Sequence, residues 1–179
     1  MIAGAVVCLV LALDPMDGGE PRASHSPASR VRALSASARV LLADAVARSA
    51  TVGSLIRELE RERVFVFIDT RIDPEIPTAQ TALLAANSTG RYIHVLLNPA
   101  LTLDRRIELL GHELHHALEI ARADDVTDAA SFRRHYGAVG RELGRSNAVA
   151  RAYETDAAHD IELQVRRELT RRGGATAPR

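Results

Sequence analysis

The segment that most constrains the fold is residues 101–123, LTLDRRIELLGHELHHALEIARA, which has the length and spacing of a long α-helix. Thr102 or Asp104 stands where this helix would begin. We expect the helix to lie in the core, with its three histidines at least partly buried. Its apolar residues recur three and four positions apart on both sides of the histidines, as the spacing of a helix requires: Ile107, Leu109, Leu110, Leu114, Leu118 and Ile120.

Four other segments are predicted to be helical. Their apolar residues recur mainly at helical intervals, and Thr51 is the expected N-cap of the second segment. The last of them is long and rich in arginine. The segments are 31–49, 51–63, 131–143 and 147–172.

Strands are expected between the helical segment 51–63 and the central helix 101–123. The β-branched and aromatic run VFVFID at 64–69 is typical of a buried strand. Residues 81–98 resemble a hairpin in which Asn87 and Gly90 suit the turn, and 71–80, with two prolines, is expected to be a loop. This order of elements favours an α+β domain, mostly helical, with a small sheet beside the histidine-bearing helix.

The N-terminal residues differ in composition from the rest. The apolar run from Ile2 to Leu13 is too short to cross a bilayer as a helix and matches the apolar region of a secretory signal, although no basic residue precedes it and no A-x-A triplet follows. We expect export to the periplasm or beyond and no stable membrane span after processing; a short membrane tether or a buried N-terminal strand is the alternative. The chain then divides into a signal-like segment with linker (1–30), one domain (31–172) and a flexible tail (173–179).

The charge balance excludes some partners. Acidic and basic side chains number 23 each in 179 residues, so no net charge points to nucleic acid or to an anionic membrane. The single cysteine, Cys8, excludes a disulfide framework within the chain and a metal site built from several cysteines.

The central helix carries the pattern H-E-x-x-H. His112 and His116 are four residues apart, so their imidazoles lie on one helix face and can bind one metal ion. Glu113 projects about 100° away, where its carboxylate can take a proton from a metal-bound water. His115 points elsewhere and is expected to be peripheral.

A third protein ligand must come from outside this pattern. Glu119 lies on the same helix face, but a straight helix cannot bring residues so far apart onto one ion, so we expect it to orient His116 or a nearby backbone segment. Glu154, expected on the final helix, is the favoured ligand and would complete a His/His/Glu site with an open position for water. His159 and Glu142 are the rival candidates.

The sequence HELHH followed by ETDA resembles the zincin metallopeptidases of gluzincin type. It also resembles small bacterial exported proteins in which a similar histidine helix precedes a segment such as SFRRHYGAVG. His112, Glu113 and His116 match the first motif of the family in full. The resemblance covers roughly residues 50–165 and implies one Zn²⁺ per chain and a peptide or protein substrate.

The second motif of that family is a helix bearing a glutamate ligand, often written E-x-E-A. Glu154 and Ala157 match it, with Asp156 in place of the second glutamate. Many members carry an acidic residue four positions after the ligand, where this chain has Ala158. The group that orients the first histidine is therefore expected to be Asp156, Asp160 or Glu119.

The resemblance also implies how a peptide would bind. In zincins an edge strand beside the active helix pairs with an extended substrate, and RYIHVLLN is the candidate here, with a plain core strand as the alternative. The donor that stabilises the oxyanion is usually His, Tyr or Arg. Four residues are available for that role, and the sequence does not select among them: His135, Tyr136, Arg151 and Tyr153.

Three functions are compatible with these residues. The leading prediction is a zinc-dependent peptidase with Glu113 as general base. The alternative is a zincin-fold protein that binds metal or a partner without turnover. A ferritin-like di-iron protein would also use Glu113-x-x-His116, but it needs a second E-x-x-H element, and we find none.

Overall fold

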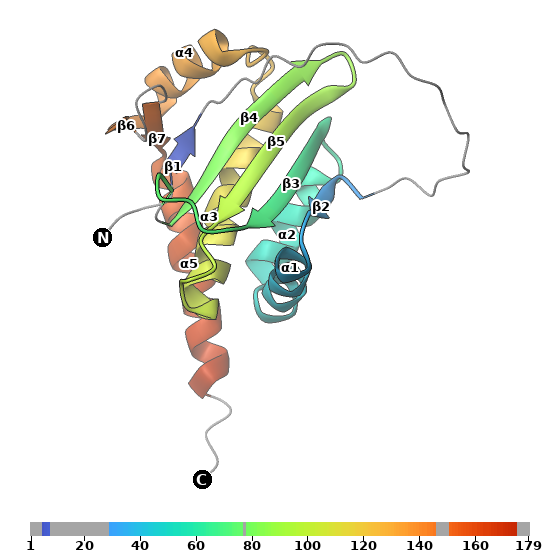
Figure 1. Cartoon of the computed structure of the whole chain (residues 1–179), viewed down its shortest axis with the longest axis vertical. Coiled ribbons are helices and arrows are strands. Elements are labelled where there is room, and N and C mark those ends of the chain that lie inside the picture. The colour runs from blue at the N-terminus through green and yellow to red at the C-terminus, as the bar shows by residue number, and fades with distance from the viewer. Residues whose placement is uncertain (1–4, 8–28, 77, 146–150, 175–179) are drawn as a thin grey trace, which may run out of the picture.

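The computed structural model describes residues 5–7, 29–76, 78–145 and 151–174, and it consists of a mixed sheet with helices packed on one face (Figure 1). The prediction of an α+β domain is confirmed. The described strands are β1 (Ala5–Val7), β2 (Val31–Ala33), β3 (Val64–Thr70), β4 (Ala79–Asn87), β5 (Gly90–Leu97), β6 (Arg141–Arg145) and β7 (Arg151–Glu154). The described helices are α1 (Ala36–Arg48), α2 (Ala50–Leu59), α3 (Leu103–Arg122), α4 (Ala129–Val139) and α5 (Asp156–Gly174).

The described strands form one sheet in the order β2-β3-β5-β4-β1-β7-β6. β4 and β5 form the expected antiparallel hairpin, with Gly90 in the turn at φ 154°. β2, β3 and β5 are mutually parallel, β1 is parallel to β4, and β7 is antiparallel to both β1 and β6. β5, which contains RYIHVLL of the predicted strand RYIHVLLN, lies inside the sheet between β3 and β4. The prediction that it offers an edge to a substrate is therefore wrong, because both of its sides are already paired.

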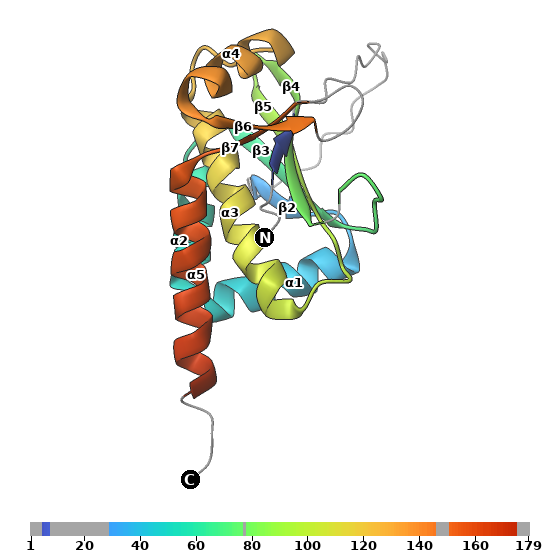
Figure 2. The ribbon, with the colours of Figure 1, turned by 90° about the vertical axis from the view of Figure 1, so that its left-hand side faces the viewer.

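α1, α2, α3 and α5 form two layers on one face of the sheet, while α4 contacts β6. α1 and α3 contact the strands, and α2 and α5 pack against α3 on the side away from the sheet (Figure 2). Strand β3 follows this arrangement residue by residue. Its alternate side chains are buried beneath the helices: Val64, Val66, Ile68 and Thr70.

α3 is the central element of the core. The Thr102 hydroxyl caps its first turn by accepting the Arg105 N–H, and every residue from 107 to 114 is buried. Gly111 allows α5 to approach closely, because a Cβ at this position would lie 2.8 Å from Cγ2 of Val165. His112, Glu113 and His116 therefore lie where other elements cover α3, and His115 is partly exposed.

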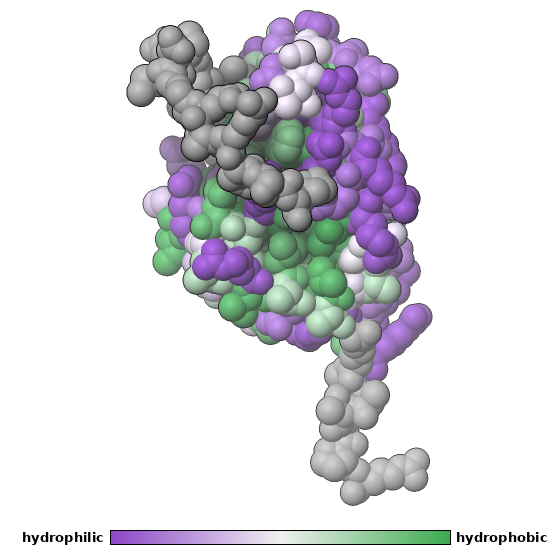
Figure 3. All heavy atoms as spheres, turned by 90° about the vertical axis from the view of Figure 1, so that its right-hand side faces the viewer, coloured by the Kyte–Doolittle hydropathy of each residue, from purple (hydrophilic) through white to green (hydrophobic). Residues whose placement is uncertain are grey.

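The first predicted helix starts later than expected. Val31–Ala33 is the strand β2, and α1 begins only at Ala36, after the N-cap Ser35. Three apolar residues of this segment, Leu34, Val40 and Val46, are exposed. The buried stripe of α1 is made of Ala38, Leu41 and Ala45. Figure 3 shows the side that carries α1 and β2, where apolar residues gather among polar ones.

The N-cap of α2 is Ser49, so the prediction of Thr51 is wrong. The Ser49 hydroxyl accepts the Val52 N–H. The Thr51 hydroxyl instead donates to Oε1 of Glu168 on α5 at 2.7 Å, while Oε2 of the same carboxylate accepts from Ser49 Oγ at 2.5 Å. These bonds tie the start of α2 to the last turns of α5.

Replacement of Glu168 by Gln is expected to make stability less dependent on pH. Burial opposes ionisation, but hydrogen bonds from Ser49 and Thr51 outweigh it and hold the pKa of Glu168 below its usual 4.5. A depressed pKa stabilises the fold above pH 4.5, and this contribution is lost as pH falls through the folded-state value. Urea unfolding should show Glu168→Gln to be less stable by about 1 kcal/mol at neutral pH, with a smaller difference in acid. An equal difference at both pH values would contradict this assignment.

The final helix is also shorter than predicted. Residues 147–150 lie outside the described part of the chain, and 151–154 form β7 rather than helix. α5 starts after Thr155, whose hydroxyl oxygen accepts the Ala158 N–H in the manner of an N-cap. Likewise α4 ends at Val139, two residues before β6 begins. Both strands were missed because each has five residues or fewer and no clear alternation.

The N-terminal segment contributes one strand to this sheet. Most of the signal-like run from Ile2 to Leu13 lies outside the described residues, but Ala5–Val7 pairs with β4 and β7. A chain cleaved after Leu13 would lack β1. Among the described helices, none combines the length and the apolar character needed to cross a membrane.

Candidate metal centre

Three potential ligand atoms converge where α3 meets the end of β7. His112 and His116 lie one turn apart on α3, and their Nε2 atoms are 3.1 Å apart. Glu154 is the last residue of β7, not a residue of the final helix as predicted. Its Oε1 lies 3.3 Å from Nε2 of His112 and 3.4 Å from Nε2 of His116.

This triangle fits a zinc ion. With bonds of 2.0–2.1 Å, adjacent ligand atoms of a tetrahedral site are separated by about 3.3 Å. The three observed separations, 3.1, 3.3 and 3.4 Å, lie around that value. Two imidazole nitrogens and one carboxylate oxygen are also donors that zinc accepts in catalytic sites, where a fourth position stays open.

The centre contains buried polar atoms that lack protein partners. His112 and His116 have no exposed surface, and 3% of Glu154 is exposed. Within the described residues, Oε2 of Glu154 and both carboxylate oxygens of Glu113 are buried without a hydrogen-bond partner. Because buried polar atoms are normally satisfied, these orphans indicate a site shaped for a group other than protein.

Glu113 is hydrogen-bonded to the sheet through its backbone carbonyl and not through its carboxylate. The Thr81 hydroxyl of β4 donates to the backbone carbonyl of Glu113 at 3.1 Å and leaves the carboxylate free. Burial raises the pKa of Glu113 to about 8. A carboxyl group with this pKa can both accept and return a proton near neutral pH, which is what a general base in hydrolysis must do.

His116 is oriented by Glu119. Oε2 of Glu119 lies 2.8 Å from Nδ1 of His116, which leaves Nε2 directed at the ligand cluster. The carboxylate of Glu119 also accepts hydrogen bonds from Tyr136 Oη at 3.1 Å and Thr155 Oγ1 at 2.7 Å. Burial would raise the pKa of Glu119, but hydrogen bonds from His115 and His116 hold it well below its usual range. Burial would lower the pKa of His116, and hydrogen bonds with Glu119 and Glu154 raise it instead.

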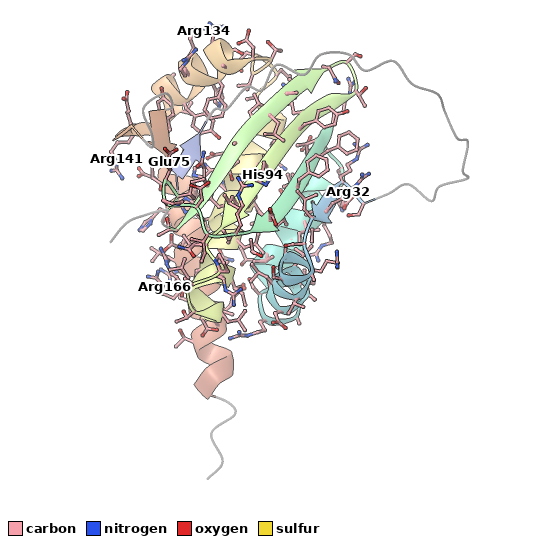
Figure 4. All side chains as sticks on the ribbon, in the orientation of Figure 1. Arg32, Glu75, His94, Arg134, Arg141 and Arg166 are labelled. Atoms are coloured by element: carbon pink, nitrogen blue, oxygen red, sulfur yellow. The ribbon has the colours of Figure 1, made fainter. Side chains whose placement is uncertain are left out.

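His112 faces a second carboxylate, Glu162 of α5. Oε2 of Glu162 lies 3.5 Å from Nδ1 of His112, and each of these buried atoms otherwise lacks a partner. The other oxygen, Oε1, accepts from Arg105 and from Arg166 Nη2, the latter at 2.8 Å. Figure 4 labels Arg166 on α5. Burial and the nearby His116 lower the pKa of His112, so His112 is neutral, the form that binds metal.

Sequence reasoning missed Glu162. The expected partners of His112 were different: Asp156 and Asp160 are exposed, and Glu119 contacts the other histidine. A signal was available in the spacing of α5, where Glu162 interrupts a buried stripe otherwise made of Ala158, Val165 and Leu169. A charged residue within such a stripe is buried, and it therefore needs a partner.

The remaining candidates lie around the cluster rather than in it. Tyr136 is buried, and its hydroxyl donates to Glu119. The ring of Tyr153 packs 6.0 Å from that of Tyr136, between centroids. His135 lies 3.5 Å from Asp125. Arg151 is in β7, with its side chain outside the described part of the structure. His159 and Glu142, the rival ligands, are both exposed, and His115 contacts Glu119 at 3.5 Å.

Loss of Glu162 is expected to weaken metal binding. Groups that orient a ligating histidine typically contribute about 10–100-fold to affinity, so Glu162→Ala should raise the dissociation constant for zinc by that factor. Asp160→Ala, an exposed site on the same helix, is the matched control and should bind zinc as wild type does. Competition with a zinc-binding dye measures both constants. Equal affinities in the two variants would exclude a role for Glu162 in orienting His112.

Comparison with known proteins adds no family to this geometry: no family model matches the chain, and no curated protein or solved structure matches it. Any function proposed for the protein therefore rests on its fold and on the residues of this cluster.

Proposed function

We propose that this protein is a zinc-dependent peptidase in which His112, His116 and Glu154 bind the metal and Glu113 is the general base. The observation that carries the proposal is the convergence of His112, His116 and Glu154 at tetrahedral spacing, and the buried, unpartnered carboxylate of Glu113 beside them supports it. A site that only bound metal structurally would need no such carboxylate. The zincin resemblance of HELHH and ETDA supports the same reaction.

The chain's own groups would divide the work of hydrolysis. A bound zinc ion would lower the pKa of a water molecule towards neutrality and polarise the carbonyl under attack. Glu113 would accept the proton of the attacking water on its carboxylate and return it to the leaving amine. Glu119 would hold His116, and Glu162 would hold His112, so that both Nε2 atoms stay directed at the metal.

A second candidate function is metal or partner binding without turnover. The observation in its favour is the closure of the site, because His112, Glu113 and His116 have no exposed surface. A peptide could not reach such a centre unless a covering element moved. This function predicts full zinc occupancy with no cleavage of any peptide.

Metal removal tests the proposal. The purified protein is expected to contain one zinc per chain, and it should cleave a generic unfolded protein substrate. Dialysis against a chelator should abolish cleavage, and stoichiometric zinc should restore it. Zinc-loaded protein that cleaves nothing in a broad peptide library would favour the binding function, and two irons per chain would contradict both zinc functions.

Export is a further part of the proposal, and it rests on the apolar run from Ile2 to Leu13. Sequencing the N-terminus of the protein recovered from cell fractions tests it. A new N-terminus beyond Leu13 in the exported fraction would support export with removal of β1.

A further inference from the structure

The strand β1 fills a slot in the sheet. On one side, Ala5, Val6 and Val7 pair in parallel with residues 80–82 of β4. On the other, Val6 and Val7 pair antiparallel with residues 152–153 of β7. Figures 1 and 2 show β1 lying between these two strands. We call the space between residues 80–82 and 152–153 the β1 slot.

The β1 slot passes the candidate metal centre. Val6 is paired with Thr81 on one side and with Tyr153 on the other. Thr81 donates to the backbone carbonyl of Glu113, and Tyr153 directly precedes the ligand Glu154. β1 also contacts α3. The residues paired with Val6 therefore lie next to Glu113, the proposed base, on one side and next to Glu154, the proposed third ligand, on the other.

β1 can leave the closed site more readily than its neighbour β7. It joins the sheet through three residues, so it makes few ladder hydrogen bonds. The neighbouring strand β7 has other anchors. Glu154 contacts both histidines, Thr155 donates to Glu119, and the ring of Tyr153 packs on Tyr136. Withdrawal of β1 would thus expose two strand edges while the ligand cluster stays in place.

We propose that the β1 slot binds an extended peptide substrate, parallel to β4 and antiparallel to β7, and that Ala5–Val7 occupies it as an internal competitor. The inference rests on the proposed peptidase function and names its regulation. Recognition through two strand edges uses the peptide backbone, so it selects an extended conformation more than a sequence. Removal of the N-terminal segment on export would open the slot.

Val6→Pro in the full chain tests the proposal, because proline cannot donate to a ladder in the interior of a sheet. An internal strand competes at an effective concentration in the millimolar range, so its release should raise kcat/KM for an unfolded substrate by about tenfold or more. Val6→Ile, which keeps a β-branched residue, should cleave as wild type does. All three proteins should contain one zinc per chain. A synthetic peptide of residues 2–10 should inhibit Val6→Pro competitively, raising KM and leaving kcat unchanged.

A second variant keeps the test decisive if Val6→Pro fails to fold. A site for a sequence-specific protease is inserted between residues 16 and 27, and the folded protein is cleaved there, so that β1 is held without a covalent link. The specific activity, per mole of enzyme, should rise as this nicked protein is diluted and fall when the 2–10 peptide is added. Activity that is independent of dilution and of added peptide would overturn the proposal.

The outcomes separate this inference from the proposed function. If wild type cleaves peptides and a zinc-loaded Val6→Pro cleaves no faster, the β1 slot is not the substrate site, and the peptidase proposal stands. If neither protein cleaves but a labelled 2–10 peptide binds Val6→Pro and not wild type, the slot binds peptide, and the peptidase proposal fails.

Discussion

Glu113→Gln is expected to lower kcat by about 10³-fold while zinc content stays at one per chain, because a positioned general base typically contributes 10²–10⁴-fold. The amide has nearly the shape of the carboxylate but cannot accept the proton of the attacking water. Glu113 is not one of the three converging ligand atoms, so the metal should remain. Steady-state cleavage of an unfolded substrate, beside metal analysis of the same sample, measures both effects.

The metal-free form of this variant gives an independent readout. Burial raises the pKa of Glu113 from 4.5 to about 8, so the folded state binds more protons than the unfolded state between these values. The contribution of Glu113 to the stability of the metal-free wild type should therefore fall as pH rises through this window, and the stability difference between wild type and Glu113→Gln should change with pH accordingly. Above pH 8 the variant should unfold at the higher temperature.

Asp104→Asn is the matched control for both measurements. Asp104 lies in the first turn of the same helix, and its exposed carboxylate pairs with Arg48. This variant should cleave and titrate as wild type does. A Glu113→Gln protein that retains most of its activity would remove Glu113 from the mechanism.

The local parts of the site could be predicted from the sequence. The pairing of His112 and His116 depends on the helical repeat alone, and the apolar spacing around them was enough to predict a buried helix. The hairpin of β4 and β5 was predictable from its turn residues, Asn87 and Gly90. In the structure Gly90 has the positive φ that glycine adopts most readily. These features involve residues close together in the chain.

The parts that were missed depend on contacts between distant residues. β2 has three residues and becomes a strand by pairing with β3, far away in the chain. β1, where a buried N-terminal strand was only the alternative prediction, likewise pairs with the distant β4. The sequence predicts helix for the strand that carries Glu154, because helix-forming residues follow it and the capping role of Thr155 becomes visible only in the structure. Spacing within one helix cannot reveal Glu162 as the partner of His112, since they come from α5 and α3.

Glu154→Ala is expected to weaken zinc binding more than about 100-fold, beyond the effect of losing a group that only orients a ligand. His112→Ala and His116→Ala should do the same, because each removes one of three converging atoms. Glu142→Ala is the matched control: it changes an exposed glutamate on the strand paired with β7 and should leave affinity unchanged.

Competition with a zinc-binding dye measures these constants, and the pattern among the variants matters more than any one value. Loss of zinc in the histidine variants with normal binding in Glu154→Ala would mean that the third ligand is not Glu154. Glu154 lies at the end of β7, next to the β1 slot, so in the proposed function this residue would link metal binding to peptide binding. Normal zinc binding without it would break that link and remove the structural basis for coupling the slot to catalysis.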